Sequence, residues 1–516
     1  MSLIKMQPRT PSLILLCIPV VAYMSVVFSS YTNITLLIIS LERKVICGTD
    51  DDDCDEDKVS SKAALYSSYI FLVESILSIL VVGFLGLFSD RFGRIPVMSL
   101  SFFGIILENS GLLMILYLDL PTIYLCFPAA LSGLCGSYAG FLCVSSAYVS
   151  DISGKFDDGK RTSSFSYFEI MLNVGGILGP IAGGWLLSTY GFEIYFIACI
   201  CFSALILLYL LILPESLSQR CCDRNEIEWL SRSTVGTLKL LFENRPYNDK
   251  IEEHSISKPL EEGIPPPPTS PPSTPPPPPS PIHSSTPSIP SSPPPSPPTS
   301  PPSSPPLSPS RLRVSFLSVA FFFTFGNTVS ASGIYVLFTS RVFGWKSFMI
   351  GVFFSTSSAI GVLALICFRP ALRLCINPSD MLMAKIGALS SGTYFLLFAL
   401  TRSPVACFVL LPLLALQTAS TPSYRSMYAA CFPPDQKGQI FAGVSCLESL
   451  SGVVCPLSFM LVYSTMSLHG LAGLTFLLLA SVALLAFSAL SFAVVSQPSQ
   501  QQTVCVVERR YVSLDG

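Results

Sequence analysis

The sequence predicts an all-α membrane protein with twelve transmembrane helices in two six-helix halves, and three observations lead to this. Of the 516 residues, 50% are hydrophobic and only 12% are charged, whereas a soluble domain has roughly 25% charged residues. The mean hydropathy is +0.60. The apolar residues gather in runs of the length, about 20 residues, that crosses a hydrocarbon core of ~30 Å. The net charge of -2 offers no basic field, so no nucleic-acid partner is expected.

Twelve apolar runs are expected to cross the lipid bilayer, six on each side of a long polar segment. The first set is 12–32, 62–88, 97–118, 121–149, 163–188 and 192–213, and the second is 314–338, 347–368, 381–401, 404–428, 439–463 and 469–496. Because the first run lacks a small-residue cleavage site, we interpret it as a helix and not as a signal peptide. The expected organisation is an N-terminal half (1–216), a linker (217–313), a C-terminal half (314–496) and a tail (497–516).

The basic residues predict that both termini are cytosolic. With the N-terminus inside, the cytosolic loops carry fourteen Lys and Arg residues and the outer loops carry seven, as the positive-inside rule requires. The first outer loop is expected to begin with the sequon Asn33-Ile34-Thr35, a candidate glycosylation site. Cys47 and Cys54 share that loop, and they either form a disulfide in an oxidising compartment or stay free thiols.

The proline residues mark a separate segment inside the predicted cytosolic linker. Of the 43 prolines, 24 lie within 265–309, so residues 262–310 are expected to be disordered and to fluctuate around polyproline II. The stretch 306–311 matches a PxxP-plus-basic ligand of SH3-type or WW proteins. A plain linker is the alternative, because PxxP arises by composition alone in such a segment.

A layout of six helices, a loop and six helices is typical of a secondary transporter with its site between two related halves. The sequence has no GxxxxGK[ST] phosphate loop and no TVGYG filter, so an ATP-driven pump and a channel of that type are not favoured. It also has no Ser-His-Asp grouping and no metal-ligand spacing. We therefore expect no enzymatic activity, no metal and no cofactor.

The loop between the second and third runs carries the most specific motif, GLFSDRFGR at 86–94. Its glycines, Gly86 and Gly93, allow a close turn, and its charged side chains can cap a helix and pair across the cytosolic gap. The string resembles the signature loop of the major facilitator superfamily, with Ile95 where a second basic residue is usual. The inner gate expected from this resemblance consists of Gly86, Asp90, Arg91, Gly93, Arg94, Asp151 and Arg161.

The fifth run contains the small-residue string GGILGPIAGG at 175–184. Small residues at this spacing let helix backbones approach closely, and a proline kinks the helix. The string resembles a motif of facilitator antiporters, although packing alone explains it. The residues expected to pack are Gly175, Gly179, Pro180, Gly183 and Gly184.

Ionisable residues inside the spans are the candidates for chemistry, because charge in a membrane is costly and marks transport pathways. Four glutamates, Glu74, Glu108, Glu169 and Glu448, are candidates for proton coupling. Burial favours the protonated form of a carboxyl group, which suits a proton carrier. Arg425 stays charged, so it would bind an anionic group or pair with an ionised glutamate. The polar residues Asn173 and Gln417 are further candidates for substrate binding.

Two stretches narrow the resemblance to one family. YVSDIS at 148–153 with Arg161-Thr162 and Phe168-Glu169, and PSYRSM at 422–427 with QIFA at 439–442 and SCLE at 445–448, are similar to the family of the proton-coupled folate transporter and the thymic stromal cotransporter. The resemblance implies that Glu169 supports proton coupling, that Arg425 affects substrate or proton binding, and that Asp151 ends the fourth helix.

Two departures from that family separate this chain from the folate transporter. The run 314–338 contains no His, which puts a His-based proton step in doubt. The expected loop 339–346 contains no Cys, so a disulfide must form elsewhere, for instance between Cys47 and Cys54. Folate is therefore not implied as the substrate.

We expect a secondary transporter that carries an organic anion together with protons toward the cytosol by alternating access. The alternatives are a proton-driven drug or solute antiporter and a membrane scaffold that recruits SH3-type partners. The resemblance to the family implies a location in the plasma membrane or the endolysosomal membrane. The tail ends in a YxxΦ pattern, Tyr511 to Leu514, which is expected to route the protein through endosomes.

Overall fold

The computed structural model describes residues 12–48, 54–153, 158–216, 311–375, 379–401, 403–431 and 437–495. Three predicted features lie outside these ranges: the proline-rich segment 262–310, its SH3-type motif, and the tail with Tyr511 and Leu514. Both sets of helices belong to one compact unit. The described residues form helices joined by short turns, as the sequence predicts for an all-α protein.

The helices of the first half share a high apolar content. They are α1 (Leu13–Cys47), α2 (Glu56–Phe92), α3 (Arg94–Tyr117), the short 3₁₀ helix η2 (Thr122–Leu125), α4 (Cys126–Leu134), α5 (Ser137–Ser153) and α6 (Asp158–Leu210). Those of the second half are α10 (Arg311–Phe343), α11 (Ser347–Cys375), α12 (Asp380–Leu400), α13 (Pro404–Val409), α14 (Leu411–Cys431), α15 (Lys437–Leu468) and α16 (Leu474–Val495).

Eleven helical segments of the described residues are long and apolar enough to cross a membrane. Three of them, Thr122–Val149, Ser347–Phe368 and Pro404–Tyr428, agree with the predicted runs to within one residue. One segment, Tyr167–Leu210, covers the predicted fifth and sixth runs together. Its helix α6 is interrupted at Gly191, whose φ of 84° is left-handed, at the boundary expected between those two runs. The total of twelve spans and the cytosolic position of the termini stay predictions.

The first helix is longer than the sequence analysis predicts, and this corrects the position of Asn33. Helix α1 continues to Cys47, because the stretch after residue 32 is rich in Leu and Ile and has no helix-breaking residue. Asn33 therefore lies inside the helix and is fully buried. Its amide donates to Ser29 Oγ at 3.3 Å and its Oδ1 accepts from Ser347 Oγ at 2.8 Å. The sequon therefore does not begin a loop as predicted, and the Asn33 amide is buried in the folded chain; glycosylation of Asn33 stays a prediction.

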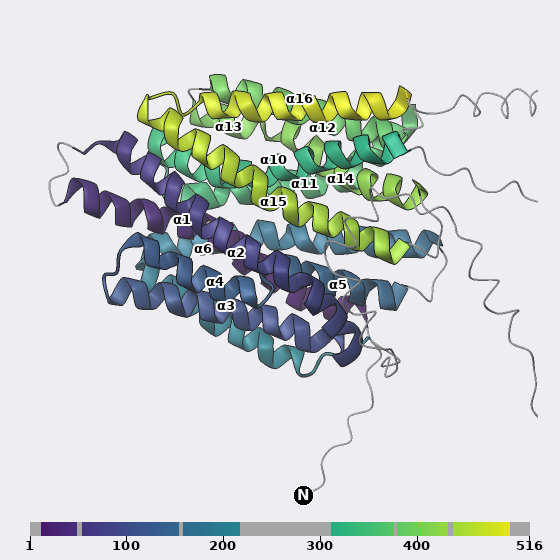
Figure 1. The fold of residues 1–516 in the computed structure, drawn as a ribbon, viewed down its shortest axis with the longest axis horizontal. Coiled ribbons are helices and arrows are strands. Elements are labelled where there is room, and N and C mark those ends of the chain that lie inside the picture. Colours follow the sequence, from purple (N-terminus) through teal and green to yellow (C-terminus); the bar gives the residue numbers. More distant parts are fainter. Residues whose placement is uncertain are drawn as a thin grey trace, which may run out of the picture. The chain divides into compact units, whose positions relative to one another are not determined.

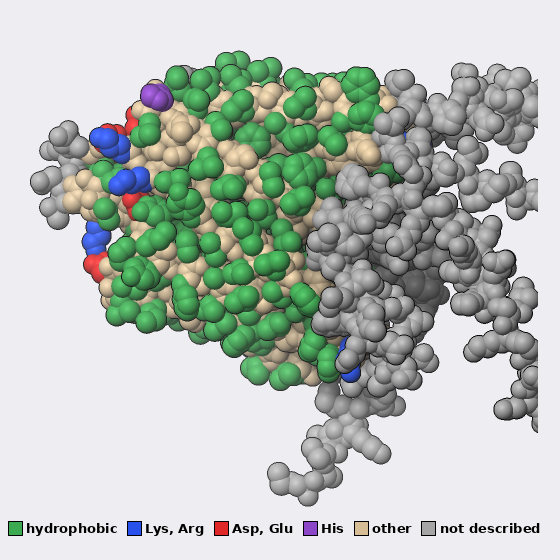
Figure 2. Space-filling view, viewed as in Figure 1, with side chains coloured by type: hydrophobic (Ala, Val, Ile, Leu, Met, Phe, Trp, Pro, Cys, Tyr) green, Lys and Arg blue, Asp and Glu red, His purple; other side chains and the backbone are tan. Residues whose placement is uncertain are grey.

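The surface of the helical unit matches a lipid-facing protein. Figure 2 shows a face covered by hydrophobic side chains, with the charged side chains near the end where α1 joins α2. Exposed leucines, isoleucines and phenylalanines occur along most of the helices. A soluble monomer rarely exposes so large an apolar surface. The chain is a multi-pass membrane protein.

Helix α6 packs between α1 of the first half and α11 of the second half, and its small residues make this possible. A Cβ at Gly175, Gly179 or Gly183 would collide with α1, at Met24, Ser25 and Ser29 respectively. A Cβ at Gly184 would lie 2.6 Å from the backbone oxygen of Ser347 on α11. On α11, a Cβ at Gly351 would collide with the backbone oxygen of Pro180. The string at 175–184 therefore presents one small face to each half.

A second contact between the halves runs along α2 and α15, which lie side by side where the lower and upper groups of helices meet in Figure 1. Together, the α6–α11 and α2–α15 contacts hold the halves around the polar residues described next.

Candidate functional site

An arginine bridges two glutamates from different helices, and we call Glu169, Arg425 and Glu448 the triad. Arg425 on α14 donates through Nη1 to Glu169 Oε1 of α6 at 2.5 Å, and through Nη2 to Glu448 Oε1 of α15 at 3.1 Å. The side chains of Arg425, Glu169 and Glu448 are 27%, 17% and 8% exposed. The planar guanidinium, with donors on two nitrogens, suits this double contact. The triad joins residues of the two halves that are 256 positions apart.

The two predicted polar substrate residues lie near the triad along their helices, but their amides bond to other groups. Asn173, one turn after Glu169, donates to the backbone oxygen of Glu169 at 2.8 Å. Gln417 donates to Thr328 Oγ1 at 2.7 Å and to the backbone oxygen of Thr324 at 3.3 Å, which ties α14 to α10. The Oε1 atom of Gln417 is buried and accepts no hydrogen bond from another described residue. Their roles in substrate binding stay predictions.

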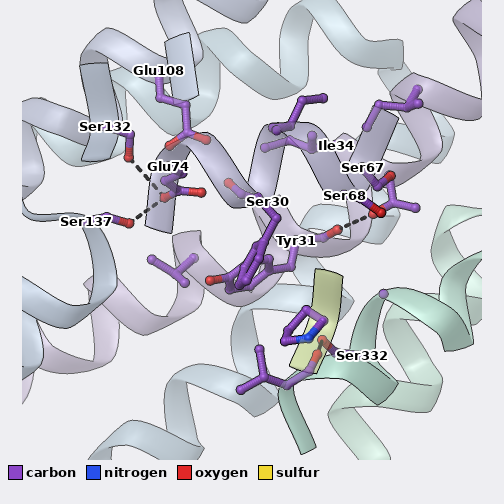
Figure 3. A pocket seen from close by; sticks show the side chains of 18 of the residues that line it. Ser30, Tyr31, Ile34, Ser67, Ser68, Glu74, Glu108, Ser132, Ser137 and Ser332 are labelled. Atoms are coloured by element: carbon purple, nitrogen blue, oxygen red, sulfur yellow. Dashed lines mark hydrogen bonds between the residues drawn. The ribbon is translucent and has the colours of Figure 1, made fainter. Parts of the chain in front are cut away.

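The other two glutamates, Glu74 of α2 and Glu108 of α3, line a cavity with an empty volume of about 970 Å³, which includes its open side. Figure 3 shows their carboxyl groups pointing toward one another. Ser132 Oγ donates to Glu74 Oε1 at 3.4 Å, and Ser137 Oγ donates to the same oxygen. Within the described chain, neither glutamate forms an ion pair. We call Glu74 and Glu108 the carboxylate pair.

A break between α4 and α5 places the serine that contacts Glu74. Gly136 and Ser137 both have left-handed φ values, 92° and 43°, and the second is unusual for a residue with a side chain. Ser78 on α2 donates to the backbone oxygen of Gly136 at 2.8 Å and so holds the break against α2. This contact brings the Ser137 hydroxyl to the carboxylate of Glu74, one turn before Ser78.

Residues of both halves line this cavity. The first half contributes Tyr23, Ser30, Tyr31, Ser67 and the carboxylate pair, and the second half contributes Val329, Ser332 and Gly333 of α10 with Pro456 and Met460 of α15. Apolar side chains such as Ile34, Ile70 and Ile105 form much of the remaining wall. A mostly apolar cavity with a few polar groups is typical of small-molecule sites.

At the end near Cys47, polar contacts join α2 directly to the second half. Ser60 Oγ lies 3.1 Å from the Tyr463 hydroxyl, and Ser61 Oγ lies 2.9 Å from Ser464 Oγ. In the same region Asp57 forms an ion pair with Arg341 of α10. The disulfide between Cys47 and Cys54 is present and ties the end of α1 to the start of α2.

The start of α2 beside this disulfide is capped by Asp55, which accepts from the backbone N–H of Lys58 at 3.1 Å. The hydrogen bonds from the side chain and backbone of Lys58 lower the pKa of the exposed Asp55 carboxyl from its ordinary value.

The opposite end of the bundle contains the predicted gate residues, and among those that the structure describes Arg94 and Asp151 contact each other inside the first half. Arg94 Nε donates to Asp151 Oδ2 at 3.0 Å, and its Nη1 donates to Ser89 Oγ at 2.7 Å. The Arg91 guanidinium lies 5.6 Å from the centre of the Phe92 ring. Gly86 packs near Cys143. The side chains of Asp90 and Arg161 lie outside the described residues.

An acidic residue that the sequence analysis did not single out completes this end. Glu215, just after α6, accepts from the backbone N–H of Arg94 at 2.9 Å and of Ile95 at 3.2 Å, so it caps the start of α3. A Cβ at Gly93, whose φ is 113°, would lie 2.9 Å from the Glu215 carboxyl carbon. The sequence signal was available, since Pro214-Glu215 directly follows an apolar run at the same predicted end.

The other functional candidates that sequence reasoning missed are hydroxyl groups. Ser132 and Ser137 contact Glu74, and Ser60, Ser61 and Tyr463 join the halves. No local pattern distinguishes them, because serine is common in all of these helices. In the part of the chain that the structure describes, no group of three or more His, Cys, Asp and Glu residues is placed to hold a metal ion.

The comparisons with known proteins agree with this architecture. The family model described as Major Facilitator Superfamily matches residues 20–456. The proton-coupled folate transporter of Rattus norvegicus is 22% identical over 433 residues, which are 84% of this chain and 79% of that protein. The lysosomal proton-coupled steroid conjugate and bile acid symporter SLC46A3 of Gallus gallus is 19% identical over 469 residues, 89% of this chain and 86% of that protein.

Two further matches show how much of a relative the sequence similarity covers and how far the fold is shared. The MFS-type transporter avaJ of Aspergillus versicolor is 32% identical over 180 residues, so the chain spans about a third, 34%, of that relative. Among solved structures, the human organic anion transporter MFSD10 (TETRAN) superposes with a TM-score of 0.58 at 17% identity, covering 93% of this chain and all of that one. At this identity the superposition shows a shared fold.

Proposed function

The chain belongs to the major facilitator superfamily, and from that premise we propose that it is a proton-coupled symporter that carries an organic anion toward the cytosol. Members of the family are transporters and not enzymes, so the chain is a membrane transporter for a small molecule. The triad carries the finer proposal, because it places one permanent cation and two carboxyl groups between the two halves.

The charge balance in the triad gives a reason why substrate transport would be coupled to protons. With both carboxyl groups ionised, Glu169 and Glu448 contribute -2 and Arg425 contributes +1, so the net charge is -1. A net charge inside a membrane protein is costly, and one bound proton removes it. We propose that the resting triad holds one proton.

An anionic substrate would change this balance. Binding a monoanion at Arg425 adds one negative charge, and protonation of the second carboxyl group restores neutrality. Glu169 is the better candidate for this second proton, because it belongs to the half opposite Arg425 and its protonation weakens the ion pair between the halves. One proton would then accompany each monoanion.

Arg425 would bind the anion through the guanidinium N–H donors that become free when Glu169 is protonated. An arginine recognises carboxylate, sulfate and phosphate groups through paired N–H donors. Two of the relatives are named as transporters of folate and of steroid conjugates and bile acids. A further relative, of Drosophila melanogaster, is 21% identical over 439 residues and is named a probable peptidoglycan muropeptide transporter. These classes contain anionic members, and they are the first substrates to test.

The two alternative functions have weaker support. Antiport was suggested by the string at 175–184, but close packing of α6 on α1 and α11 explains those small residues. A pure scaffold does not explain the triad or the cavity. Recruitment of SH3-type or WW proteins stays an additional proposal, as does the location in the plasma membrane or the endolysosomal membrane, with Tyr511 to Leu514 as the sorting motif.

The test is uptake into proteoliposomes that contain the full chain, with folates, steroid sulfates and muropeptides offered at acidic and neutral external pH. The proposal expects substrate and protons to enter together, and uptake to rise with the inward proton gradient. Glu169→Gln should remove the dependence on the gradient, because glutamine cannot exchange a proton. The matched control is Glu193→Gln, an exposed glutamate of the same helix, which should keep it.

Two results would contradict the proposal. Uptake that ignores external pH in both the wild type and Glu169→Gln would remove proton coupling. Proton flux opposite to substrate flux would replace symport by antiport.

A further inference from the structure

We propose that the cavity at the carboxylate pair binds a protonated amino group of the transported molecule, so that the substrate is an amine as well as an anion. The inference rests on the proposed transport function and adds a second binding point to it. Four observations carry it: the missing cation, a buried hydroxyl group without a partner, the aromatic and apolar wall, and the position between the halves.

The first observation is the difference in charge between cavity and triad. Glu74 and Glu108 line the cavity, and among the described residues that line it none is Lys, Arg or His. Ser132 and Ser137 donate to one oxygen of Glu74, and hydroxyl donors stabilise an ionised carboxylate. Two carboxyl groups without a cation from the protein are costly to ionise inside a membrane protein, and a cationic ligand would compensate their charge.

The second observation comes from two other serines of the cavity wall. The hydroxyl oxygen of Ser67 on α2 is buried and has no hydrogen-bond partner in the described part of the chain. Ser30 on α1 also lines the cavity, and its hydroxyl is close enough to bond to Tyr195. Buried polar atoms normally have partners, so the Ser67 oxygen is open to a bound group. Figure 3 shows both serines around the same space as the carboxylate pair.

The hydrogen-bonding capacity of this wall matches a primary ammonium group. Such a group donates three hydrogen bonds and accepts none. The free oxygen of Glu74, the carboxylate of Glu108 and a serine hydroxyl supply three acceptors. A bound proton would need neither the additional hydroxyl groups nor a cavity of this size. An organic cation therefore explains more of the residues that line the cavity.

The third observation concerns the rest of the ligand. The rings of Tyr23 and Tyr31 line the cavity, and an aromatic face attracts a cation. Ile34, Ile70 and Ile105 provide an apolar wall for a hydrocarbon body. The ligand is therefore an amine attached to an apolar or aromatic group, and not a small inorganic cation.

The fourth observation is the position of the cavity. Residues of α10 and α15 from the second half close it opposite α1, α2 and α3. A site shared by both halves changes when they move relative to one another, which is what a transported ligand requires. A purely structural pair of glutamates inside the first half would not need this placement.

The inference is tested by measuring ligand binding to the full chain in lipid nanodiscs. Tyramine is the probe, and N-acetyltyramine is its uncharged analogue of similar shape. Wild-type protein should bind tyramine at least about tenfold more tightly than N-acetyltyramine, because hydrogen bonds to charged groups are stronger than hydrogen bonds between neutral groups. Glu74→Gln and Glu108→Gln should each weaken tyramine binding by roughly 10- to 100-fold. Glu193→Gln, exposed on α6, should bind like the wild type.

The outcomes separate this inference from the proposed function. Equal affinity for the two probes in the wild type, or no binding of tyramine at millimolar concentration, overturns the amine site even if uptake proves proton-coupled. This comparison needs no variant, so a substitution that disturbs folding does not affect it. Selective tyramine binding together with pH-independent uptake would keep the amine site and reject proton coupling at the triad.

Discussion

The triad and the carboxylate pair both place two glutamates in the middle of the protein, but they are neutralised differently. In the triad, Arg425 contacts both Glu169 and Glu448 and joins the two halves. In the carboxylate pair, Glu74 and Glu108 come from the same half, and their hydrogen-bonding neighbours are serines. One region supplies its own cation, and the other leaves the cation to come from outside the protein.

This difference suggests a division of labour between the two regions. A carboxylate held by an arginine can release that arginine when it takes a proton, so the triad suits coupling between a proton and an anion. A carboxyl group held only by neutral hydroxyls has no cation from the protein, so a cationic ligand can supply the compensating charge. The same residue type thus serves two purposes, and the neighbouring side chains decide which.

The largest effect is expected from a cross-link between the halves. Ser61 and Ser464 lie with their Oγ atoms 2.9 Å apart, so cysteines at both positions should form a disulfide on oxidation. The cross-link would hold α2 to α15 and stop alternating access, and uptake should fall to background and return after reduction. The single variants Ser61→Cys and Ser464→Cys, and the wild type under the same treatment, serve as controls. Full uptake by the oxidised double variant would show that this contact does not open during transport.

Removal of the arginine should affect the triad alone. Arg425→Ala leaves two buried carboxylates without their cation, and breaking a buried ion pair costs about 3–5 kcal/mol, with the lower end appropriate for a side chain that is 27% exposed. The unfolding temperature and the proton-coupled uptake should both fall.

Adding Glu169→Gln and Glu448→Gln to Arg425→Ala should recover the unfolding temperature, because the uncompensated charge is gone, but not the uptake. Tyramine binding should persist in these variants. Its loss would mean that the two regions act as one site.

A change in the packing of one helix should affect the triad and leave the carboxylate pair unchanged, because the two lie on different helices. A Cβ at Gly179 would collide with the backbone of Ser25, so Gly179→Ala should displace α6 from α1 and lower the stability by about 1–3 kcal/mol, the usual cost of overpacking. Because α6 carries Glu169, uptake should fall, while α2 and α3 keep the carboxylate pair. The matched control is Gly452→Ala on α15, where a Cβ would meet nothing within 4 Å. Thermal unfolding and uptake measure both variants, and equal behaviour of the two would contradict the close packing.

The smallest effect is expected from one hydroxyl group. Ser137→Ala removes a donor to Glu74, and a single hydrogen bond contributes about 0.5–1.5 kcal/mol, so tyramine affinity should change by roughly 2- to 10-fold. The dependence of uptake on the proton gradient should not change. The control is Ser110→Ala on α3, whose exposed hydroxyl contacts only its own helix. A loss of proton coupling in Ser137→Ala would assign the carboxylate pair to the proton pathway instead.

The sequence predicted the helices well where composition changes sharply. The runs at 121–149 and 404–428 begin at a proline, the run at 347–368 lies between Lys346 and Arg369, and the bounds of all three agree with the structure to within one residue. It failed at the end of the first run, because Asn33 is a polar residue inside a helix that continues for another four turns. A single polar residue does not end a helix when its amide can bond to neighbouring helices, and those neighbours are not visible in a local pattern.

The sequence by itself determined that this chain is a helical membrane protein, that a loop with the facilitator motif lies at 86–94, and that five ionisable residues lie inside apolar runs. Composition and motif spacing carry that information locally. Only the tertiary structure decided that Arg425 contacts Glu169 and Glu448 while Glu74 and Glu108 share a cavity. These contacts join residues far apart in the chain, and the charge on a buried carboxylate depends on what lies beside it in space.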